Sequence, residues 1–235
     1  MIALSYSRLS TYLKCPRQFS LQYVDKAFPD DSNNPHFVRG NNIHKQLEDY
    51  AAAKVRKKQI PTVTIPSLSP ECIGPSKMVD GMLDSFEMII PEAQISVDKD
   101  FKKVDWFSKQ SYYRAIFDLL CFTEGSPNAV LLDWKTGKVR DYDHSEHGQL
   151  RLSACIVFSL LPYIEKVTVA YVFVDHKQTI KAEFHRDELP AMLESFHGAH
   201  KTVNTDEEWL PKVNQYCKWC AATPEQCEYA TSKKW

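Results

Sequence analysis

The chain has 235 residues, of which 43% are hydrophobic and 25% are charged, and its formal net charge is −1. This balance is that of an ordinary folded soluble protein, and no apolar run is long enough to span a membrane. The near-neutral charge argues against a broad, sequence-independent nucleic-acid-binding surface but leaves room for a local basic track.

The first 90 residues show helical periodicity interrupted by prolines and polar loops. A proline disfavours helix at the residue before it, so the first helical stretch should break near Cys15-Pro16. Further along, Ile43, Leu47 and Tyr50 form one apolar stripe of a longer helix. The predicted elements are helices over 7–24, 37–57 and 71–90, a loop over 25–36 and a connector over 58–70.

The period then changes to that of strands rich in Val, Ile, Phe and Tyr. A turn at residues 124–128 joins the second and third of them. The order of elements predicts an α/β fold with one mixed sheet flanked by helices, in a single domain over residues 1–235. The predicted elements are strands over 93–106, 111–122, 129–136, 166–174 and 178–185, and helices over 145–161 and 187–202.

A carboxylate and an ammonium group lie at the end of the third strand. Side chains alternate along a strand, so Asp133 and Lys135 share one face with Leu131, while Leu132 and Trp134 take the other. Taken alone, the pair is most simply an ion pair at a strand exit.

Asp118 gives that pair a second interpretation. It lies inside an apolar strand, where carboxylates are seldom buried without a partner. Folding the strands back about a turn near Ser126 places Asp118 opposite residues 133–135. Two adjacent carboxylates repel each other unless a cation lies between them, and a hard ion such as Mg²⁺ or Mn²⁺ suits oxygen ligands.

Two helices carry further candidate residues. His44 lies one turn before Glu48, although a lone helix histidine is usually a packed or surface residue. Gln149 and Ser153 lie one turn apart and could bind a phosphate, orient Lys135 or form a polar helix start.

Two basic runs could supply the local track, or be solvated helix ends and loops. They contain Lys54, Arg56, Lys57 and Lys58, and Lys135, Lys138 and Arg140.

The ordered set Gly40…His44, Asp118, Asp133-x-Lys135 and Gln149 resembles the PD-(D/E)XK nuclease superfamily. More narrowly, it resembles the RecB-like branch, which includes the exonucleases associated with CRISPR adaptation and many phage exonucleases. The resemblance covers about residues 40–155, on matching helix, strand, strand and helix elements. It implies a restriction-endonuclease-like core.

The resemblance also implies roles for these residues. Lys135 would position the attacking water and stabilise charge on the scissile phosphate, and Gln149 would match the glutamine of the family. The chain departs from the family at Ala115, where glycine is frequent, and at Ser153, where tyrosine is frequent. Substrate contacts in that helix are therefore expected to differ. The implied ligands of Mg²⁺ or Mn²⁺ are His44, Asp118, Asp133 and the backbone carbonyl of Trp134.

The seven cysteines include a compact trio near the end of the sequence. Residues 1–20 lack the apolar core of a signal peptide, so we expect a cytoplasmic protein (in the host cytoplasm if the source is viral) with reduced thiols or metal ligands rather than disulfides. Cys-x-x-Cys suits zinc or an iron–sulfur cluster, and thiolate softness does not choose between them. A set that binds no metal, with Cys15 as a core thiol, is the remaining alternative.

The family resemblance favours a [4Fe–4S] cluster, which would tie the N-terminal helix to the tail. Residues 1–36 and 203–235 would then form a cluster subregion beside a catalytic core over residues 37–202. The other cysteines lie in apolar contexts and are predicted to be core residues. The expected cluster ligands are Cys15, Cys217, Cys220 and Cys227, and the expected core thiols are Cys72, Cys121 and Cys155.

These observations predict a metal-dependent DNA exonuclease acting on single-stranded ends in replication, recombination or repair. The alternative is a non-catalytic nucleic-acid-binding or scaffolding module that keeps the fold and the cysteine staple. DNA is the expected partner, with a helicase or recombination protein as a further candidate and no membrane. Aromatics near the site, such as Trp134, Tyr112 and Tyr113, could stack on bases or belong to the core.

Overall fold

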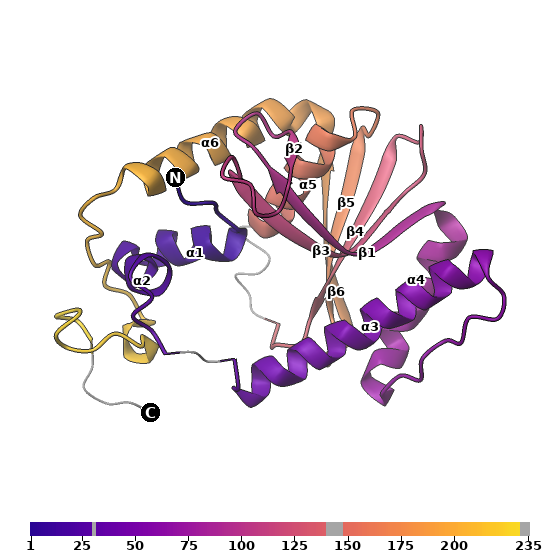
Figure 1. Ribbon diagram of the computed structural model, residues 1–235, viewed down its shortest axis with the longest axis horizontal. Helices are drawn as coiled ribbons and strands as arrows, with labels where there is room; N and C mark the ends of the chain where they lie inside the picture. The colour runs from indigo at the N-terminus through magenta and orange to yellow at the C-terminus, as the bar shows by residue number, and fades with distance from the viewer. Residues whose placement is uncertain (30–31, 140–147, 231–235) are drawn as a thin grey trace.

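A six-stranded sheet in the order β2-β1-β3-β4-β5-β6 forms the centre of the computed structural model, which describes residues 1–29, 32–139 and 148–230 (Figure 1). Neighbouring strands are antiparallel except for β4 and β5, which are parallel. The predicted α/β fold with one mixed sheet is confirmed. The strands are β1 Met88–Val97, β2 Lys103–Val104, β3 Tyr113–Phe122, β4 Asn128–Lys135, β5 Lys166–Phe173 and β6 Gln178–His185.

Helices cover both faces of the sheet. In Figure 1, α3 and α4 lie on one side, whereas α1, α5 and α6 lie on the other. Within the described part of the chain, no helix is long and apolar enough to cross a membrane. The helices are α1 Tyr6–Lys14, α2 Pro16–Phe19, α3 Pro35–Gln59, α4 Ile73–Ser85, α5 Gly148–Leu160 and α6 Leu189–Thr205, and a π-helical turn follows α2 at Ser20–Val24.

Each face of the sheet carries its own hydrophobic core. Leu131 packs into the core that α1, α5 and α6 share, whereas Leu132 and Trp134 pack into the core under α3 and α4. Helix α5 is the crossover between the parallel strands β4 and β5, and such a connection needs a helix laid across the sheet. Because α5 lies between the sheet and α6, most of its side chains are buried and it shows no polar face.

Two predicted elements are wrong in extent. The helix expected over 71–90 ends at Ser85, and the chain enters β1 at Met88. A short apolar run such as Met88–Ile90 has no period that separates helix from strand. The strand expected over 93–106 ends at Val97, and a turn with Phe101 at φ 55° separates it from β2.

Candidate metal and phosphate site

The site begins where β3 and β4 separate. These strands are paired from Phe122↔Ala129 to Leu119↔Leu132, and the pairing stops there. The next residue of β3 is Asp118, which is 8% exposed, and its Oδ2 accepts a 2.6 Å hydrogen bond from the backbone N–H of Trp134. The Asp118 carboxylate therefore accepts a hydrogen bond from a backbone N–H just beyond the last β3–β4 pair. This hydrogen bond holds the carboxylate between the two strands.

Both β1 and β3 exchange faces at this level. Ile89 packs under α3 and α4, but Ala93 packs on the α5 side, although regular alternation would give them the same face. In β3, likewise, Leu119 packs under α3 and α4, whereas Phe117 packs on the α5 side. Between them, Glu92 has φ 47°, a left-handed conformation that is unusual for a residue with a side chain. Because the register is the same on both sides of this break, Glu92 comes opposite Asp118.

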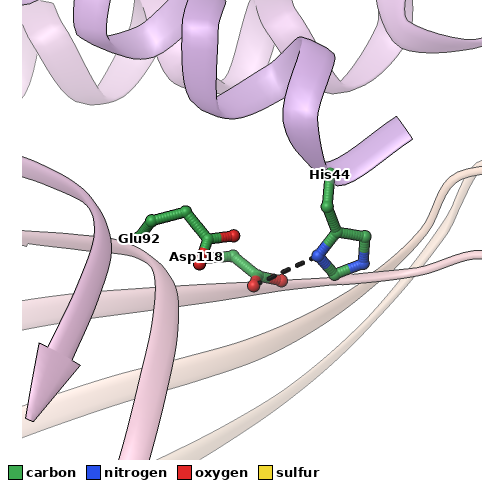
Figure 2. Close-up of side chains that lie close together, drawn as sticks. All are labelled: His44, Glu92 and Asp118. Carbon is green, nitrogen blue, oxygen red and sulfur yellow. Dashed lines mark ion pairs between the residues drawn. The ribbon is translucent and has the colours of Figure 1, made fainter. Parts of the chain in front are cut away.

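His44 completes a group of three ligand-type side chains from three elements. Its Nδ1 lies 3.3 Å from Oδ1 of Asp118, and ligand atoms of His44, Glu92 and Asp118 lie within 4.8 Å of one another (Figure 2). Helix α3 approaches the end of β4 closely at Gly40, where a Cβ would lie 3.2 Å from Oγ1 of Thr136. One nitrogen and several oxygens in this spacing are a donor set that fits a hard divalent ion.

A second group lies on the other face of β4. Gln149, at the start of α5, donates from Nε2 to Oδ1 of Asp133 at 2.7 Å. Lys135 Nζ lies 2.6 Å from Oδ2 of Asp133 and donates to Oε1 of Gln149 at 3.2 Å. The three side chains thus form a closed triangle, and Tyr171 adds a 3.3 Å hydrogen bond to Oε1 of Gln149.

Electrostatic coupling links the two groups. Burial lowers the pKa of His44, but the hydrogen bond to Asp118 and the charges of Asp118, Asp133 and Glu92 outweigh burial and raise it. Burial raises the pKa of Asp133, Lys135 opposes this increase, and Asp118 adds to it. Burial also raises the pKa of Glu92, with further increases from Asp118 and Glu48. The carboxylates therefore repel one another, and a cation between them would relieve this repulsion.

Two cavities flank these residues. One, here called the acidic pocket, has a volume of about 450 Å³ and is lined by His44, Glu48, Glu92 and Thr136 together with the first turns of α3. The other, here called the basic groove, has a volume of about 730 Å³ and reaches Lys135 and Gln149 from the side of α1. The site is therefore accessible from both faces of the sheet.

The structure places the residues selected from the sequence in two groups. His44 and Asp118 lie with Glu92, whereas Asp133, Lys135 and Gln149 lie together on the other face of β4, and Asp133 is outside the group of ligand atoms within 4.8 Å. The Trp134 side chain is buried, so only its backbone can reach the site. Ser153 donates to the backbone carbonyl of Gln149 rather than to Lys135.

Glu92 escaped selection from the sequence. Like Asp118, Glu92 is an acidic residue within an apolar run, and this pattern could have identified it. It was missed because a helix was predicted to residue 90, where the structure has strand β1.

For two other sets of residues, the structure agrees with the structural alternative and not with a role in binding. Trp134, Tyr112 and Tyr113 are buried in the core and expose no ring face for a base. The basic run of residues 54–58 lies at the end of α3, where Lys54 pairs with Asp80 and Lys58 donates to the carbonyl of Leu83. This run is therefore a helix end packed on α4 and lies outside the site. Of the second run, Lys135 and Lys138 line the basic groove, and Arg140 lies outside the described residues.

Cys72, Cys121 and Cys155 are buried core residues, as the sequence suggested, and Cys15 is buried as well. Cys15, Cys217, Cys220 and Cys227 line one small cavity between α2 with the turn after it and the C-terminal segment. Backbone N–H groups of Lys212 and Asn214 point at the sulfurs of Cys15 and Cys217, at 3.4 and 3.3 Å. In the described part of the chain, only the His44 group has three ligand atoms within 4.8 Å, so these sulfurs are spaced more widely.

Comparison with known proteins gives one family. The sequence model of the PD-(D/E)XK nuclease superfamily matches residues 3–228. Solved structures that resemble the chain include the crystal structure of SSO0001, with a TM-score of 0.46 and 13% sequence identity, covering 92% of this chain and 81% of that one. No curated protein matches the chain.

Proposed function

Because the chain belongs to the PD-(D/E)XK nuclease superfamily, whose chemistry is metal-dependent hydrolysis of phosphodiester bonds in nucleic acids, we propose that it is a DNA exonuclease of the RecB-like branch. It would act on single-stranded ends during replication, recombination or repair. A helicase or recombination protein would supply the unwound strand.

One observation carries this proposal: ligand-type and cationic side chains meet where β3 and β4 separate. His44, Glu92, Asp118 and Asp133, with the carbonyl of Trp134, would hold Mg²⁺ or Mn²⁺. A divalent ion bound by oxygen ligands supplies charge neutralisation at phosphorus and an activated water. Burial and mutual repulsion of the carboxylates favour such an ion over an empty site.

Lys135 and Gln149 would act on the phosphate side of the same centre. Lys135 places a positive charge at the mouth of the basic groove, where a scissile phosphate would lie. Its ion pair with Asp133 and its hydrogen bond to Gln149 hold the ammonium group in place. Gln149 is therefore a positioning residue for both Asp133 and Lys135.

The test is digestion of end-labelled DNA with Mn²⁺ or Mg²⁺. A linear single-stranded oligonucleotide should be shortened from an end, while a covalently closed circle of the same sequence should persist. Equal cleavage of both would contradict the exonuclease assignment and indicate an endonuclease. No metal-dependent cleavage of either, with binding retained, would favour the alternative of a non-catalytic binding or scaffolding module.

We further propose that Cys15, Cys217, Cys220 and Cys227 bind a [4Fe–4S] cluster, in a subregion formed by residues 1–36 and 203–235. Their convergence on one cavity supports a shared ligand. A tetrahedral zinc ion, with Zn–S bonds of about 2.3 Å, would need sulfurs about 3.8 Å apart. No three of these sulfurs lie within 4.8 Å of one another, which is wider than a zinc ion needs, and it is the family resemblance that favours the cluster.

Protein purified without oxygen tests the cluster. It should be brown, absorb broadly near about 400 nm and contain iron. Cys217→Ser should lose iron, whereas Cys155→Ala, at a core thiol, should keep it. Colourless protein with one bound zinc would replace the cluster by zinc, and four free thiols without metal would reject both.

A further inference from the structure

The basic groove has a one-sided charge. Its charged residues are Arg8, Arg114, Lys135 and Lys138, and none of the described residues that line it is acidic. Lys135 is paired with Asp133, but none of the other three has an acidic partner within 4.0 Å among the described residues. Cations whose charge is not neutralised by an acidic partner along one groove are the electrostatic footprint of a polyanion.

Exposed apolar side chains lie beside these cations. Ile116 is 44% exposed although it lies within β3, and it lines the groove together with Trp106. The guanidinium of Arg114 lies 5.5 Å from the Trp106 ring, which orients both side chains. Phe107, the next residue, is 87% exposed. Such a platform is unexplained by folding, because each of these side chains would be more stable in the core.

The groove also has a defined position relative to the site. It is continuous from Lys135 and Gln149, beside the proposed metal ligands, to Trp106 and the first turn of α1. Ser5 caps α1 and accepts from the N–H of Arg8, and Ser7 is exposed at the same helix start. The positive end of the α1 dipole therefore adds to the cationic wall.

We propose that the basic groove binds the unpaired DNA strand, with its phosphates on Arg8, Arg114 and Lys138 and a base stacked on Trp106. This inference rests on the proposed function and adds the substrate path to it. A duplex offers phosphates but keeps its base faces stacked inside, so it leaves the Trp106 platform unused. The combination of cations with a half-buried aromatic ring that lines the groove favours a single strand.

Fluorescence anisotropy with labelled oligo(dT) in EDTA tests the groove without cleavage. Trp106→Ala should weaken binding about tenfold, as loss of one stacked base does, and Trp106→Phe should restore most of the affinity. Trp219→Ala is the control, since Trp219 is more exposed (64%) but lies in the cysteine segment, away from the groove. Unchanged affinity in Trp106→Ala would overturn the stacking platform.

The cationic wall is tested by salt dependence. Arg8→Gln and Lys138→Gln should each lower the slope of log K against log salt by about 0.7, and Lys181→Gln on edge strand β6 should not. Unchanged slopes in both groove variants, or equal affinity for a duplex or for oligo(U), would overturn the assignment to single-stranded DNA.

Cleavage with Mn²⁺ is measured separately. Inactive wild-type protein with Trp106-dependent binding would reject the nuclease and keep the groove. If the protein cleaves DNA but its binding does not depend on Trp106, Arg8 or Lys138, the nuclease assignment would stand and the groove assignment would be rejected.

Discussion

The acidic pocket and the basic groove lie on opposite sides of one short segment. Thr136 lines the acidic pocket, whereas Lys135, Gly137 and Lys138 line the basic groove. Lys135 and Thr136 can serve different surfaces because successive side chains point in opposite directions. His44, Glu92 and Asp118 lie apart from the proposed contacts to the strand, whereas Asp133 pairs with Lys135 of the groove. Substitutions should therefore separate metal-dependent cleavage from DNA binding.

The largest effect should come from Asp133→Asn. Loss of this carboxylate should slow cleavage by at least about 10³-fold, or about 4 kcal/mol, while affinity for oligo(dT) in EDTA stays close to wild type. Single-turnover cleavage and anisotropy measure the two quantities. Asp80→Asn is the control, because Asp80 pairs with Lys54 and Tyr50 away from the site. Wild-type cleavage by Asp133→Asn would show that the site assignment is wrong.

Gly148→Ala should affect the groove side alone. A Cβ at this position would overlap the ring of Tyr6, which lines the groove. We expect a loss of about 1–3 kcal/mol, seen as a melting temperature lower by about 2–4 °C per kcal/mol, with weaker DNA binding and unchanged Mn²⁺ binding. Gly81→Ala, on open helix surface, should instead stabilise by up to about 1 kcal/mol. Equal melting of the two variants would contradict this account.

Glu92→Gln should affect the acidic side alone. Removing one ligand should raise the Mn²⁺ concentration for half-maximal cleavage about tenfold, or about 1.4 kcal/mol, and leave oligo(dT) affinity unchanged. Glu183→Gln, an exposed glutamate of β6, is the control. An unchanged Mn²⁺ requirement in Glu92→Gln would remove Glu92 from the ligand set.

The smallest effect concerns pH and the metal-free protein. The pKa of Glu92 is raised by burial and by Asp118 and Glu48, so folding favours its uncharged form. Its contribution to stability is present below the unfolded value of about 4.3 and is lost as pH rises through the raised folded value.

In thermal melts with EDTA, the melting temperature of Glu92→Gln should therefore be higher than that of wild type at neutral pH, and the difference should shrink as the pH is lowered. Added Mn²⁺ should reverse the order at neutral pH, because the wild type binds the ion more tightly. A gap that does not change with pH would contradict the shifted titration of Glu92.

The residues on regular elements were accessible from the sequence. A period of two along β4 and one turn near Ser126 suffice to bring Asp118 opposite residues 133–135, and the structure has that register. Glu92 was not accessible, since it lies where β1 departs from the alternation on which such reasoning depends. Of the basic groove, Lys135 and Lys138 were named as a local basic track, but Arg8 and Arg114 were missed, because they come from α1 and β3, which are distant in sequence.

The wall that α1 gives to the groove has a consequence for synthesis on the ribosome. Helix α1 is fixed by late residues: Ile2 donates to Asn204, 202 positions away, and Tyr12 donates to Asp206, 194 positions away. At about 5–20 residues per second, the partners follow the helix by roughly 10–40 s. A nascent chain can therefore contain β1–β4 and every proposed metal ligand while the segment before α1 is held only by the bridge between Leu4 and Tyr113. The wall that α1 gives to the groove gains its bonds to Asn204 and Asp206 only after α6 has been synthesised.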